Sequence, residues 1–425
     1  MRRSRTVGLA VPAVLAVLLT GCAGTTSGDS GAAGGTAGGE APAAAGWDPA
    51  TKTIKVGALY PTSGPFANTI QDIIGMRAYF ERATSGGGIL EGYNVEVESA
   101  DTQYDVTRAI PQYQQMKDDV AIFGTLGGFI AEALPLVADN KVTVTPVVDK
   151  FDSPNILPVY PTFEIFAANS VAYAAGKEGG KDGVYCALLQ DGAIGDQTDF
   201  GVRHATDELG LNYAASASFP TANPSDLTAQ VVTLKDAGCT EIMVGGVFVM
   251  QQAAARAAQL GWEPHWTALG ITYVSDIATG TAAEYIKKNV SFVWTGSDWT
   301  DKTVEGAANM AADVEAVEPG SPPALVTYET GYASAITMAA VLRKALDAGD
   351  MSPEGIVKAS NQVGEVDMFG LAGGTTDYGT GPDDRKAPRE VTFFEVTDET
   401  AQGVRAIERN YTSEVGNSVG FFRAG

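Results

Sequence analysis

The stretch Lys55-Val-Gly-Ala-Leu-Tyr-Pro-Thr-Ser-Gly-Pro-Phe66 decides the fold of this chain. The residues from Ile54 to Leu59 form a short apolar run that is typical of a buried strand, and the prolines and glycine that follow end it. From Thr69 to Phe80, apolar residues recur at helical spacing, which predicts a helix with one face on a sheet. Gly86-Gly87-Gly88 ends this helix, and a second strand is predicted from Val95 to Ser99. The stretch therefore predicts a β-loop-α-β unit.

The loop from Tyr60 to Phe66 is the first candidate binding site. In open α/β sheets, ligands bind beyond the carboxyl ends of the strands, because the N-terminus of the following helix offers free N–H groups there. This loop joins such a strand end to such a helix. We therefore predict that Tyr60 and Phe66 contact a ligand.

The same region is similar to the opening of a known family. Lys55-Val-Gly-Ala-Leu-Tyr-Pro, Gly64-Pro65-Phe66, Gly86-Gly87-Gly88-Ile89 and Asp101 together resemble the opening of the leucine/isoleucine/valine-binding-protein family. Members of that family are receptors of ABC importers with the type I periplasmic-binding-protein fold. The resemblance, which runs from about Thr53 to about Thr397, implies an α/β fold of two doubly wound parallel-sheet lobes. It also implies a three-crossing hinge, with a ligand cleft between the lobes.

Strand and helix patterns alternate along the chain, break and then restart, which is consistent with two lobes. Pro154, Pro158 and Pro161 cluster at the break. We predict that lobe 1 comprises residues 52–162 plus 297–370, and that lobe 2 comprises residues 163–296 plus 371–425.

The predicted elements beyond the first unit follow from the same apolar periodicity. Ser225 is predicted to cap a helix that carries Val231 and Leu234. The other elements are strands at 120–123, 142–145, 184–190, 214–219, 242–247, 266–270, 290–294 and 391–396, and helices at 105–117, 131–140, 198–209, 304–317 and 324–346.

Composition narrows the classes of function. The chain has 425 residues, of which 45% are hydrophobic, and this length favours two domains over one core. Lys and Arg total 28 against 51 Asp and Glu, so the net charge is −23. Because such a surface repels phosphates, we expect no nucleic acid partner.

The N-terminus carries an export signal. Arg2, Arg3 and Arg5 precede an apolar run from Val7 to Leu19, which is too short to span a bilayer but suits a signal-peptide core. Leu19-Thr-Gly-Cys22 then resembles a bacterial lipobox, whose cysteine is lipidated. We predict that residues 1–21 are a lipoprotein signal peptide and that Cys22 anchors the protein to the outer face of the cell membrane. The alternative is an ordinary signal peptide with an incidental cysteine.

Residues 22–51 are predicted to form a flexible tether. The segment consists mainly of Gly, Ala, Ser and Thr, and it lacks the apolar periodicity that would offset the entropy of ordering the chain.

Two further loops follow strand ends in the first half of the chain. If the sheet is parallel, they open on the same edge as the first loop. The candidate ligand contacts in these loops are Gly127, Gly128, Phe129, Val147 and Asp149. Other interpretations stay open, because the two glycines also suit a plain tight turn and Asp149 suits a hinge or cap acid.

The resembled family holds the carboxylate and ammonium of its ligand with Ser or Thr on these loops and with an acid in the second lobe. Here Gly128 stands where a Ser is expected, Val147-Val148-Asp149 replaces Ala-Ala-Thr, and Ile271-Thr272-Tyr273 stands where the acid would be. Gly128 still offers an N–H to a carboxylate, whereas Asp149 favours a cation or a hydroxyl donor. Amides and aromatic acids are therefore candidate ligands beside amino acids.

Aromatic and polar side chains gather on the predicted cleft loops. Each aromatic residue alone is more typical of the core than of a ligand contact, but together they favour a planar or apolar ligand with a few polar contacts. Besides those already named, the candidates are Glu164, Phe166, Gln190, Phe248, Gln251, Thr272, Tyr273 and Trp299.

Cys186 and Cys239 form a candidate disulfide. Both flank apolar runs, and an exported protein can form disulfides, but two buried thiols are the alternative.

No catalytic or metal-binding pattern is recognisable. His204 and His265, the two histidines, accompany no nucleophile motif, and neither zinc ligand spacing nor a dinucleotide-binding fingerprint occurs. We therefore expect a protein that is not an enzyme and that needs no cofactor and no metal.

The sequence thus predicts an extracytoplasmic, lipid-anchored receptor that closes on a small organic solute and delivers it to an ABC permease. Its partners would be the solute, the permease subunits and the membrane, and we expect it to act as a monomer. The alternative is a sensing lipoprotein that reports to a membrane signalling receptor; an enzyme ranks third.

Overall fold

The computed structural model describes residues 41–124, 141–145, 154–220, 224–274, 276–299 and 301–422. They all belong to one compact unit. The predictions that fall on Cys22, on the signal peptide and on residues 22–40 of the tether lie outside the described residues, as do the predicted helix at 131–140 and Gly127, Gly128, Phe129, Val147 and Asp149. The prediction that the tether extends to residue 51 is wrong, because Ala41 and Trp47 are buried and Trp47–Asp48 pair with the first sheet.

The first sheet is built around β2, the strand of the Lys55 stretch. β2 pairs in parallel with β3 on one side and with β4 on the other, and β5 and β6 continue the parallel order. A short β1 pairs antiparallel with the start of β2. The strands are β1 (Trp47–Asp48), β2 (Thr53–Tyr60), β3 (Asn94–Asp101), β4 (Ile122–Gly124), β5 (Thr143–Thr145) and β6 (Ile156–Pro158). The sequence did not predict β6, an edge strand whose end residue is Pro158, because prolines suggested only a break.

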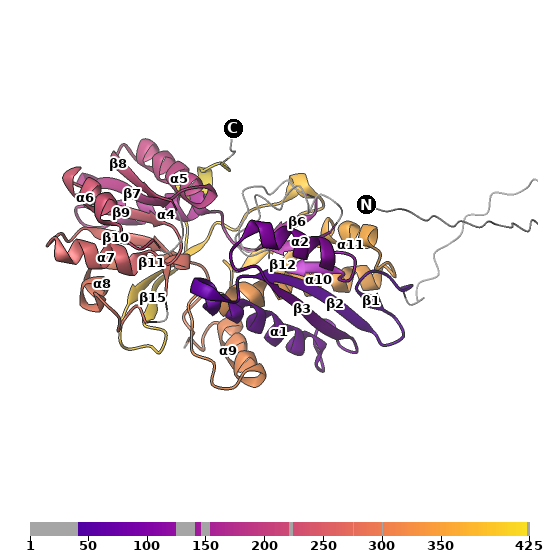
Figure 1. Cartoon of the computed structure of the whole chain (residues 1–425). Coiled ribbons are helices and arrows are strands. Elements are labelled where there is room, and N and C mark those ends of the chain that lie inside the picture. Colours follow the sequence, from indigo (N-terminus) through magenta and orange to yellow (C-terminus); the bar gives the residue numbers. More distant parts are fainter. Residues whose placement is uncertain are drawn as a thin grey trace, which may run out of the picture. The chain divides into compact units, whose positions relative to one another are not determined.

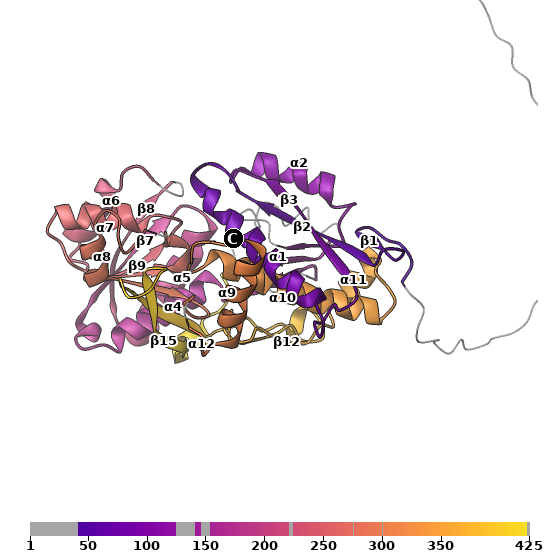
Figure 2. The same ribbon diagram turned by 90° about the horizontal axis from the view of Figure 1, so that it is seen from below.

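Helices α1 and α10 pack on each other and on this sheet. Figure 1 shows β2 and β3 side by side, and Figure 2 shows α1 next to α10. α2 contacts β2, α9 packs on α1, and α11 packs on α10. The helices are η1 (Gly64–Thr69), α1 (Ile70–Thr84), α2 (Val106–Met116), α9 (Glu305–Val317), α10 (Thr327–Asp347) and α11 (Pro353–Ser360).

The second sheet has the order β15-β14-β11-β10-β9-β7-β8. β8, β7, β9, β10 and β11 are parallel, whereas β14 and β15 are antiparallel to their neighbours. The strands are β7 (Val184–Gln190), β8 (Asn212–Phe219), β9 (Glu241–Gly245), β10 (His265–Leu269), β11 (Val290–Trp294), β14 (Val391–Val396) and β15 (Val404–Tyr411). The predicted strands 184–190 and 290–294 match β7 and β11 residue for residue.

Helices cover both faces of the second sheet. α4 and α5 pack together on β7 and β9, while α6, α7 and α8 follow one another along β8, β7 and β11. They are α4 (Phe163–Ala175), η2 (Gly180–Asp182), α5 (Ala193–Leu209), α6 (Thr228–Asp236), α7 (Met250–Gln259), η3 (Gly270–Thr272), α8 (Ala283–Asn289) and α12 (Glu414–Ser418). Among the residues whose placement is described, no helix combines the length and apolar character that crossing a membrane requires.

The prediction that Ser225 caps α6 is wrong. The helix begins at Thr228, and its N-cap is Leu227, whose side chain makes no capping bond. Asp226 instead accepts hydrogen bonds from the N–H and the hydroxyl of Thr228, at 2.9 and 2.6 Å. An aspartate two residues before a free N–H forms a local turn of this kind, and here it replaces the cap that the serine would have made.

Both sheets have the same strand order around their first long parallel strand. The second strand lies on one side of it and the third on the other, so β2/β4 and β7/β9 are the two points at which the winding direction reverses. The prediction of two doubly wound α/β lobes is thus confirmed, with two antiparallel strands added to the second sheet.

The chain passes between the two sheets three times. Segment 159–162 leads from β6 to α4, segment 295–304 leads from β11 to α9, and segment 368–390 leads toward β14. We call these crossings 1, 2 and 3. Crossing 3 includes β13 (Thr375–Asp377), which pairs with β12 (Glu365–Asp367) in a small separate sheet, and η4 (Pro382–Asp384).

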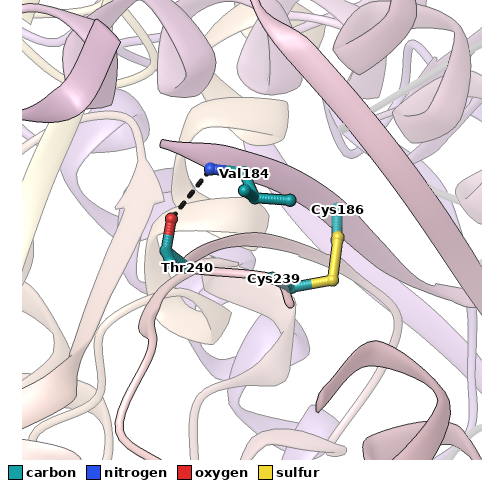
Figure 3. Close-up of a disulfide and its surroundings, with 4 residues drawn as sticks. All are labelled: Val184, Cys186, Cys239 and Thr240. Atoms are coloured by element: carbon teal, nitrogen blue, oxygen red, sulfur yellow. Dashed lines mark hydrogen bonds between the residues drawn. A yellow bond between two sulfur atoms is a disulfide. The ribbon is translucent and has the colours of Figure 1, made fainter. Parts of the chain in front are cut away.

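A disulfide joins Cys186 in β7 to Cys239, just before β9. The two Cα atoms lie 5.9 Å apart, and both residues are buried. Figure 3 shows the sulfur–sulfur bond beside a second link between the same strands, in which the Val184 N–H donates to the Thr240 hydroxyl at 2.9 Å. The disulfide therefore links β7 and the start of β9, the two neighbouring strands between which the winding direction of this sheet reverses.

Helices α1 and α10 approach closely enough for their backbones to touch. A Cβ on Gly331 of α10 would lie 1.7 Å from the Asp72 carbonyl oxygen of α1, and a Cβ on Gly75 would lie 2.1 Å from the Tyr328 carbonyl oxygen. Each helix thus carries a glycine where the other helix's backbone passes, and no larger residue fits without moving the helices apart.

We therefore predict that Gly331→Ala destabilises the protein, although Gly→Ala inside a helix is normally stabilising by roughly 0.5–1 kcal/mol. The expected loss in the free energy of unfolding is about 1–3 kcal/mol, because the added methyl forces the packed helices apart. Denaturant titration measures it. Gly86→Ala is the control, since the Gly86 Cβ position is nearly open, and it should stay within about 0.5 kcal/mol of wild type. Equal effects of the two substitutions would contradict the prediction.

Candidate ligand-binding site

Gln190 bridges the reversal point of the second sheet. It is the last residue of β7, and its Oε1 accepts a hydrogen bond from the Val247 N–H in the loop after β9, at 3.1 Å. The side chain is 8% exposed. In doubly wound sheets this is where ligands bind, because the loops after the two strands diverge there. The contact therefore fixes the shape of the loop at the expected position of a ligand.

Phe248 continues the same loop in a strained conformation. Its φ of +51° lies in the left-handed region, which is rare for bulky residues and often marks a functional site. Its N–H donates to the Ile271 carbonyl oxygen after β10, at 3.3 Å. The loops after β7, β9 and β10 are thus joined by hydrogen bonds through Gln190, Val247 and Phe248.

Thr272 and Tyr273 lie at the same edge, in and after η3. Thr272 is buried, and its hydroxyl has no hydrogen-bond partner among the described residues. The Tyr273 hydroxyl is satisfied elsewhere, because it donates to the Gln402 carbonyl oxygen at 2.6 Å, and burial raises the pKa of this tyrosine. Of the two, Thr272 is the side chain that retains unused hydrogen-bonding capacity.

In the first sheet, Tyr60 lies at the carboxyl edge that corresponds to this one. Asp101 fixes the loop that follows Tyr60. Tyr60 ends β2 and is buried. Asp101 ends β3 and accepts hydrogen bonds from the Thr62 N–H at 2.9 Å and the Ser63 hydroxyl at 2.5 Å. Although burial opposes the effect, these bonds and one from the Gln103 N–H lower the pKa of Asp101. The side chain of Phe66 lies outside the described parts of the structure.

Phe166 and Glu164 lie in the packing of α4. Phe166 is fully buried and stacks on Trp294, with ring centroids 5.0 Å apart and planes at 3°. Glu164 is also fully buried, and its Oε1 accepts from the Phe422 N–H of the C-terminal segment at 3.0 Å. Burial raises the pKa of Glu164. The structure thus gives both residues packing roles.

Gln251 and Trp299 have local partners. Gln251 Nε2 donates to Asp276 Oδ1 at 3.0 Å, and the Trp299 ring lies 5.1 Å from the Tyr328 ring. Trp299 belongs to crossing 2, which polar contacts with Arg409 tie to β15.

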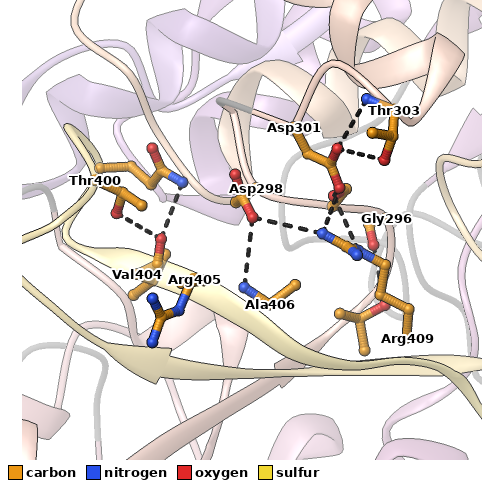
Figure 4. Close-up of polar contacts among 12 residues, drawn as sticks. Gly296, Asp298, Asp301, Thr303, Thr400, Val404, Arg405, Ala406 and Arg409 are labelled. Atoms are coloured by element: carbon orange, nitrogen blue, oxygen red, sulfur yellow. Dashed lines mark hydrogen bonds and ion pairs between the residues drawn. The ribbon is translucent and has the colours of Figure 1, made fainter.

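Figure 4 shows these contacts, in which Asp298 and Asp301 face the Arg409 side chain. Arg409 Nε donates to the Ser297 hydroxyl at 3.2 Å, and Ser297 donates to Asp301 Oδ2 at 3.0 Å. The Arg409 guanidinium pairs with Asp301 and lies 3.7 Å from Asp298 Oδ2. Crossing 2 is therefore held to the antiparallel end of the second sheet.

The predicted residues thus fall into two groups. Gln190, Phe248, Thr272 and Tyr273 come together at the edge of the second sheet, and Tyr60 lies at the matching edge of the first. The remaining described candidates, Glu164, Phe166, Gln251 and Trp299, have partners in the surrounding fold.

Sequence reasoning missed Val247, Asp101 and Glu329. Val247 contributes through its backbone, which leaves no signal in the sequence. Asp101 and Glu329 did leave one: Asp101 lies two residues after the predicted strand 95–99, and Glu329 is the only charged residue in α10 before Arg343. The described residues contain no group of three or more His, Cys, Asp or Glu side chains that could hold a metal ion.

We predict that Gln190→Ala loosens the loop after β9. The substitution leaves the N–H of the partly buried Val247 without its acceptor, which should lower the free energy of unfolding by about 1–3 kcal/mol. Amide hydrogen exchange at Val247 and Phe248 should become faster, as read by mass spectrometry or NMR. Gln259→Ala, at an exposed position on α7, is the control and should change neither quantity. Unchanged exchange in the Gln190 variant would show that the bridge does not hold the loop.

Comparison with known proteins places this architecture in a family. A family model described as periplasmic binding protein matches residues 53–402. A Leu/Ile/Val-binding protein homolog from Brucella suis is 27% identical over 232 residues, which is 49% of this chain and 57% of that relative's length. The chain therefore matches little more than half of this curated relative.

Solved structures share the fold. A fatty acid ABC transporter substrate-binding protein from Thermomonospora curvata has a TM-score of 0.77 at 18% identity, with 90% of this chain and 97% of that chain covered. A branched-chain amino acid ABC transporter protein from Thermus thermophilus with bound valine has a TM-score of 0.70 at 15% identity, covering 86% of this chain and 98% of that one. With the family match, two doubly wound sheets and three crossings, the chain belongs to the periplasmic binding protein family, and its fold is the type I fold that Leu/Ile/Val-binding proteins share.

Proposed function

We propose that this protein is an extracytoplasmic receptor that binds a small organic solute between its two lobes and delivers it to an ABC importer. The observation that carries the proposal is the Gln190–Val247 contact at the reversal point of the second sheet, with the strand end of Tyr60 at the matching point of the first. Two such points joined by three chain crossings suit a ligand that touches both lobes.

Binding would work by closure of the lobes. A solute that contacts both strand edges gains more contacts when the lobes approach, so it favours the closed arrangement over the open one. The crossings would absorb the rotation while each sheet stays packed. In this mechanism the protein orients and encloses the solute, and we propose that it is not an enzyme and uses no cofactor.

We propose an amino acid, an amide or an aromatic acid as the solute. Phe248 and Tyr60 supply aromatic surface at the two edges, and the unpaired Thr272 hydroxyl supplies one hydrogen bond. The ligands named for the structural relatives, valine and a fatty acid, extend the range of candidates. Tyr60, Gln190, Phe248 and Thr272 are the described residues that we assign to the site, together with Gly127, Gly128, Phe129, Val147 and Asp149 of the loops outside the described residues.

We also propose that lipidated Cys22 holds the protein, as a monomer, at the outer face of the cell membrane. The lipobox-like Leu19-Thr-Gly-Cys22 supports this, as do residues 22–40, the part of the predicted tether that precedes the described fold. A flexible chain of that length would reach about 25 Å, enough to let the receptor dock onto a permease. The same fold would serve a sensing lipoprotein, which would instead be recovered with a membrane signalling receptor.

A solute screen tests the proposed function. Leucine, valine, phenylalanine, benzoate, benzamide and hexanoate should each be tested by thermal shift, and at least one class should raise Tm. A ligand at a hundredfold excess over Kd stabilises by about 2.7 kcal/mol. With the ligand that binds, small-angle scattering should report a smaller radius of gyration. Binding without any decrease in the radius would refute closure.

Thr272→Val locates the site. Replacing an unpaired buried hydroxyl by a methyl group costs no hydrogen bond in the unbound protein, so stability should be unchanged, whereas affinity for a solute that bonds to it should fall about 3–10-fold. Thr267→Val, also buried but in the body of β10, is the control and should bind normally. Equal affinities of the two variants would place the ligand elsewhere.

Cys22→Ala tests the anchor. Because two or more acyl chains hold a protein durably on a bilayer, loss of the acceptor thiol should move the protein from the membrane fraction to the soluble fraction. Immunoblotting after cell fractionation measures the distribution, with Ser27→Ala in the tether as control. Persistent membrane attachment of the Cys22 variant would refute lipidation at this residue.

A further inference from the structure

The carboxyl group of Glu329 lies where the three crossings meet. Glu329 is in the first two turns of α10, a helix of the first sheet, and is 1% exposed. The neighbouring positions of the helix up to Val341 carry no other charge. A carboxyl group in such an apolar setting is costly unless it is hydrogen-bonded, so its contacts require an explanation.

Crossing 2 contacts this carboxyl group through two consecutive residues. The Thr295 hydroxyl donates to Glu329 Oε1 at 3.1 Å. Gly296 follows with φ of +67°, and a Cβ there would lie 2.4 Å from Glu329 Oε2. Position 296 therefore requires glycine for two reasons. Its backbone conformation favours glycine, and the Glu329 carboxyl group occupies the space that a side chain would need.

Crossing 3 contacts the same oxygen in a strained stretch. The Ala372 N–H donates to Glu329 Oε1 at 3.2 Å. Ala372 has φ of +49° and Phe369 has φ of +55°, two non-glycine residues in the left-handed region within four positions. Such conformations persist only where the surroundings hold them, and the bond to Glu329 is one of the contacts that does so.

Crossing 1 contributes Tyr160. Its ring packs on Trp294 with centroids 5.3 Å apart, and its buried hydroxyl lies close enough to Glu329 for the carboxylate charge, after burial, to raise the pKa of the tyrosine. The Tyr160 hydroxyl and Glu329 Oε2 have no hydrogen-bond partner of good geometry among the described residues. Movement of the crossings would therefore break no hydrogen bond between these two atoms and the described residues.

The surroundings determine the charge of Glu329. Burial raises its pKa to about 8, against the opposing effect of the bonds from Ala372 and Thr295 and of the nearby Tyr160 hydroxyl. Asp72 of α1 is a buried acid near Tyr160, and burial raises its pKa as well. Asp298 and Asp367, on crossing 2 and just before crossing 3, are engaged elsewhere: Asp298 is near Arg409, and Asp367 accepts from the Phe369 N–H at 2.8 Å.

We propose that Glu329 is a positioning residue that holds the three crossings in one arrangement and thereby sets the equilibrium between the lobe arrangements. No other described side chain is bonded to both crossing 2 and crossing 3 while its own helix packs on the first sheet. The effect of Glu329 on solute affinity rests on the proposed function. If only a fraction of the receptor is in the binding-competent arrangement, the apparent Kd for the solute is the intrinsic Kd divided by that fraction.

The test measures the distance between the sheets without any solute. Spin labels attached through a keto amino acid at Glu96 of β3 and Glu208 of α5, both exposed, avoid the native cysteines. Pulsed electron paramagnetic resonance then gives the distance distribution for wild type, Glu329→Gln and Glu329→Ala at pH 6.5 and pH 9.5. Ser334→Ala, another buried polar position on α10, is the control for general destabilisation.

The expected result follows from the chemistry of glutamate, glutamine and alanine at position 329. The amide that Glu329→Gln introduces imitates the protonated carboxyl group, so this variant should give the narrow wild-type distribution of pH 6.5 at both pH values. Wild type should change between the two, because ionisation of the buried group disturbs its contacts. Glu329→Ala should give a broad distribution at both, with protection of the Ala372 amide from exchange reduced at least tenfold.

Two outcomes would overturn the proposal. One is a Glu329→Ala protein with the wild-type distribution and wild-type protection at Ala372. The other is a wild type and a Glu329→Gln protein that respond to pH identically, since a purely space-filling role would give that result. Because no solute is present, the proposed function can fail in the solute screen while this result stands, and the reverse also holds.

Discussion

Parallel pairing of the strands on either side of each reversal point is the constraint on which the rest of this structure depends. In a parallel ladder the carboxyl ends of neighbouring strands lie at one edge, so β2 with β4, and β7 with β9, bring loops far apart in the sequence together. Gln190 meets Val247 only because β7 and β9 are paired in this register. The disulfide from Cys186 to Cys239 joins the same two strands near their other end.

Buried polar groups do the rest of the positioning, and they gather where the chain leaves one sheet for the other. A carboxyl group that is removed from water must find hydrogen-bond donors, and the donors nearest to Glu329 are those of crossings 2 and 3. The same demand ties Ser297 and Asp301 to Arg409 of β15. The need to form hydrogen bonds with buried polar groups therefore determines the paths of the crossings, which carry little apolar periodicity of their own.

Particular residues show where prediction from the sequence succeeded and where it failed. The apolar run 184–189, with Gln190 after it, predicted both ends of β7 correctly, because the pattern of a strand buried on both faces is a continuous apolar run. The predicted helix at 198–209 begins five residues earlier, at Ala193, because Gly195 lets the helix approach the end of β7: a Cβ there would lie 2.0 Å from the Gln190 carbonyl oxygen. The packing of this helix on β7 thus requires a glycine at position 195. Gln190, Phe248 and Thr272 were found as candidates from their places after strands, whereas Glu164 and Phe166, equally suitable by type, are held in the packing of α4.

The sequence by itself determined the alternation of strands and helices, the two restarts and the family resemblance, because apolar periodicity and turn residues act over short stretches of chain. It also determined which strand ends could carry a site. Only the tertiary structure decided which side chains share that site, that Asp226 takes the place of Ser225 at the start of α6, and that three distant segments converge on Glu329. The contacts of Glu329 join residues tens of positions apart, and they depend on register, backbone strain and the need to satisfy buried polar atoms, none of which is written in a local pattern.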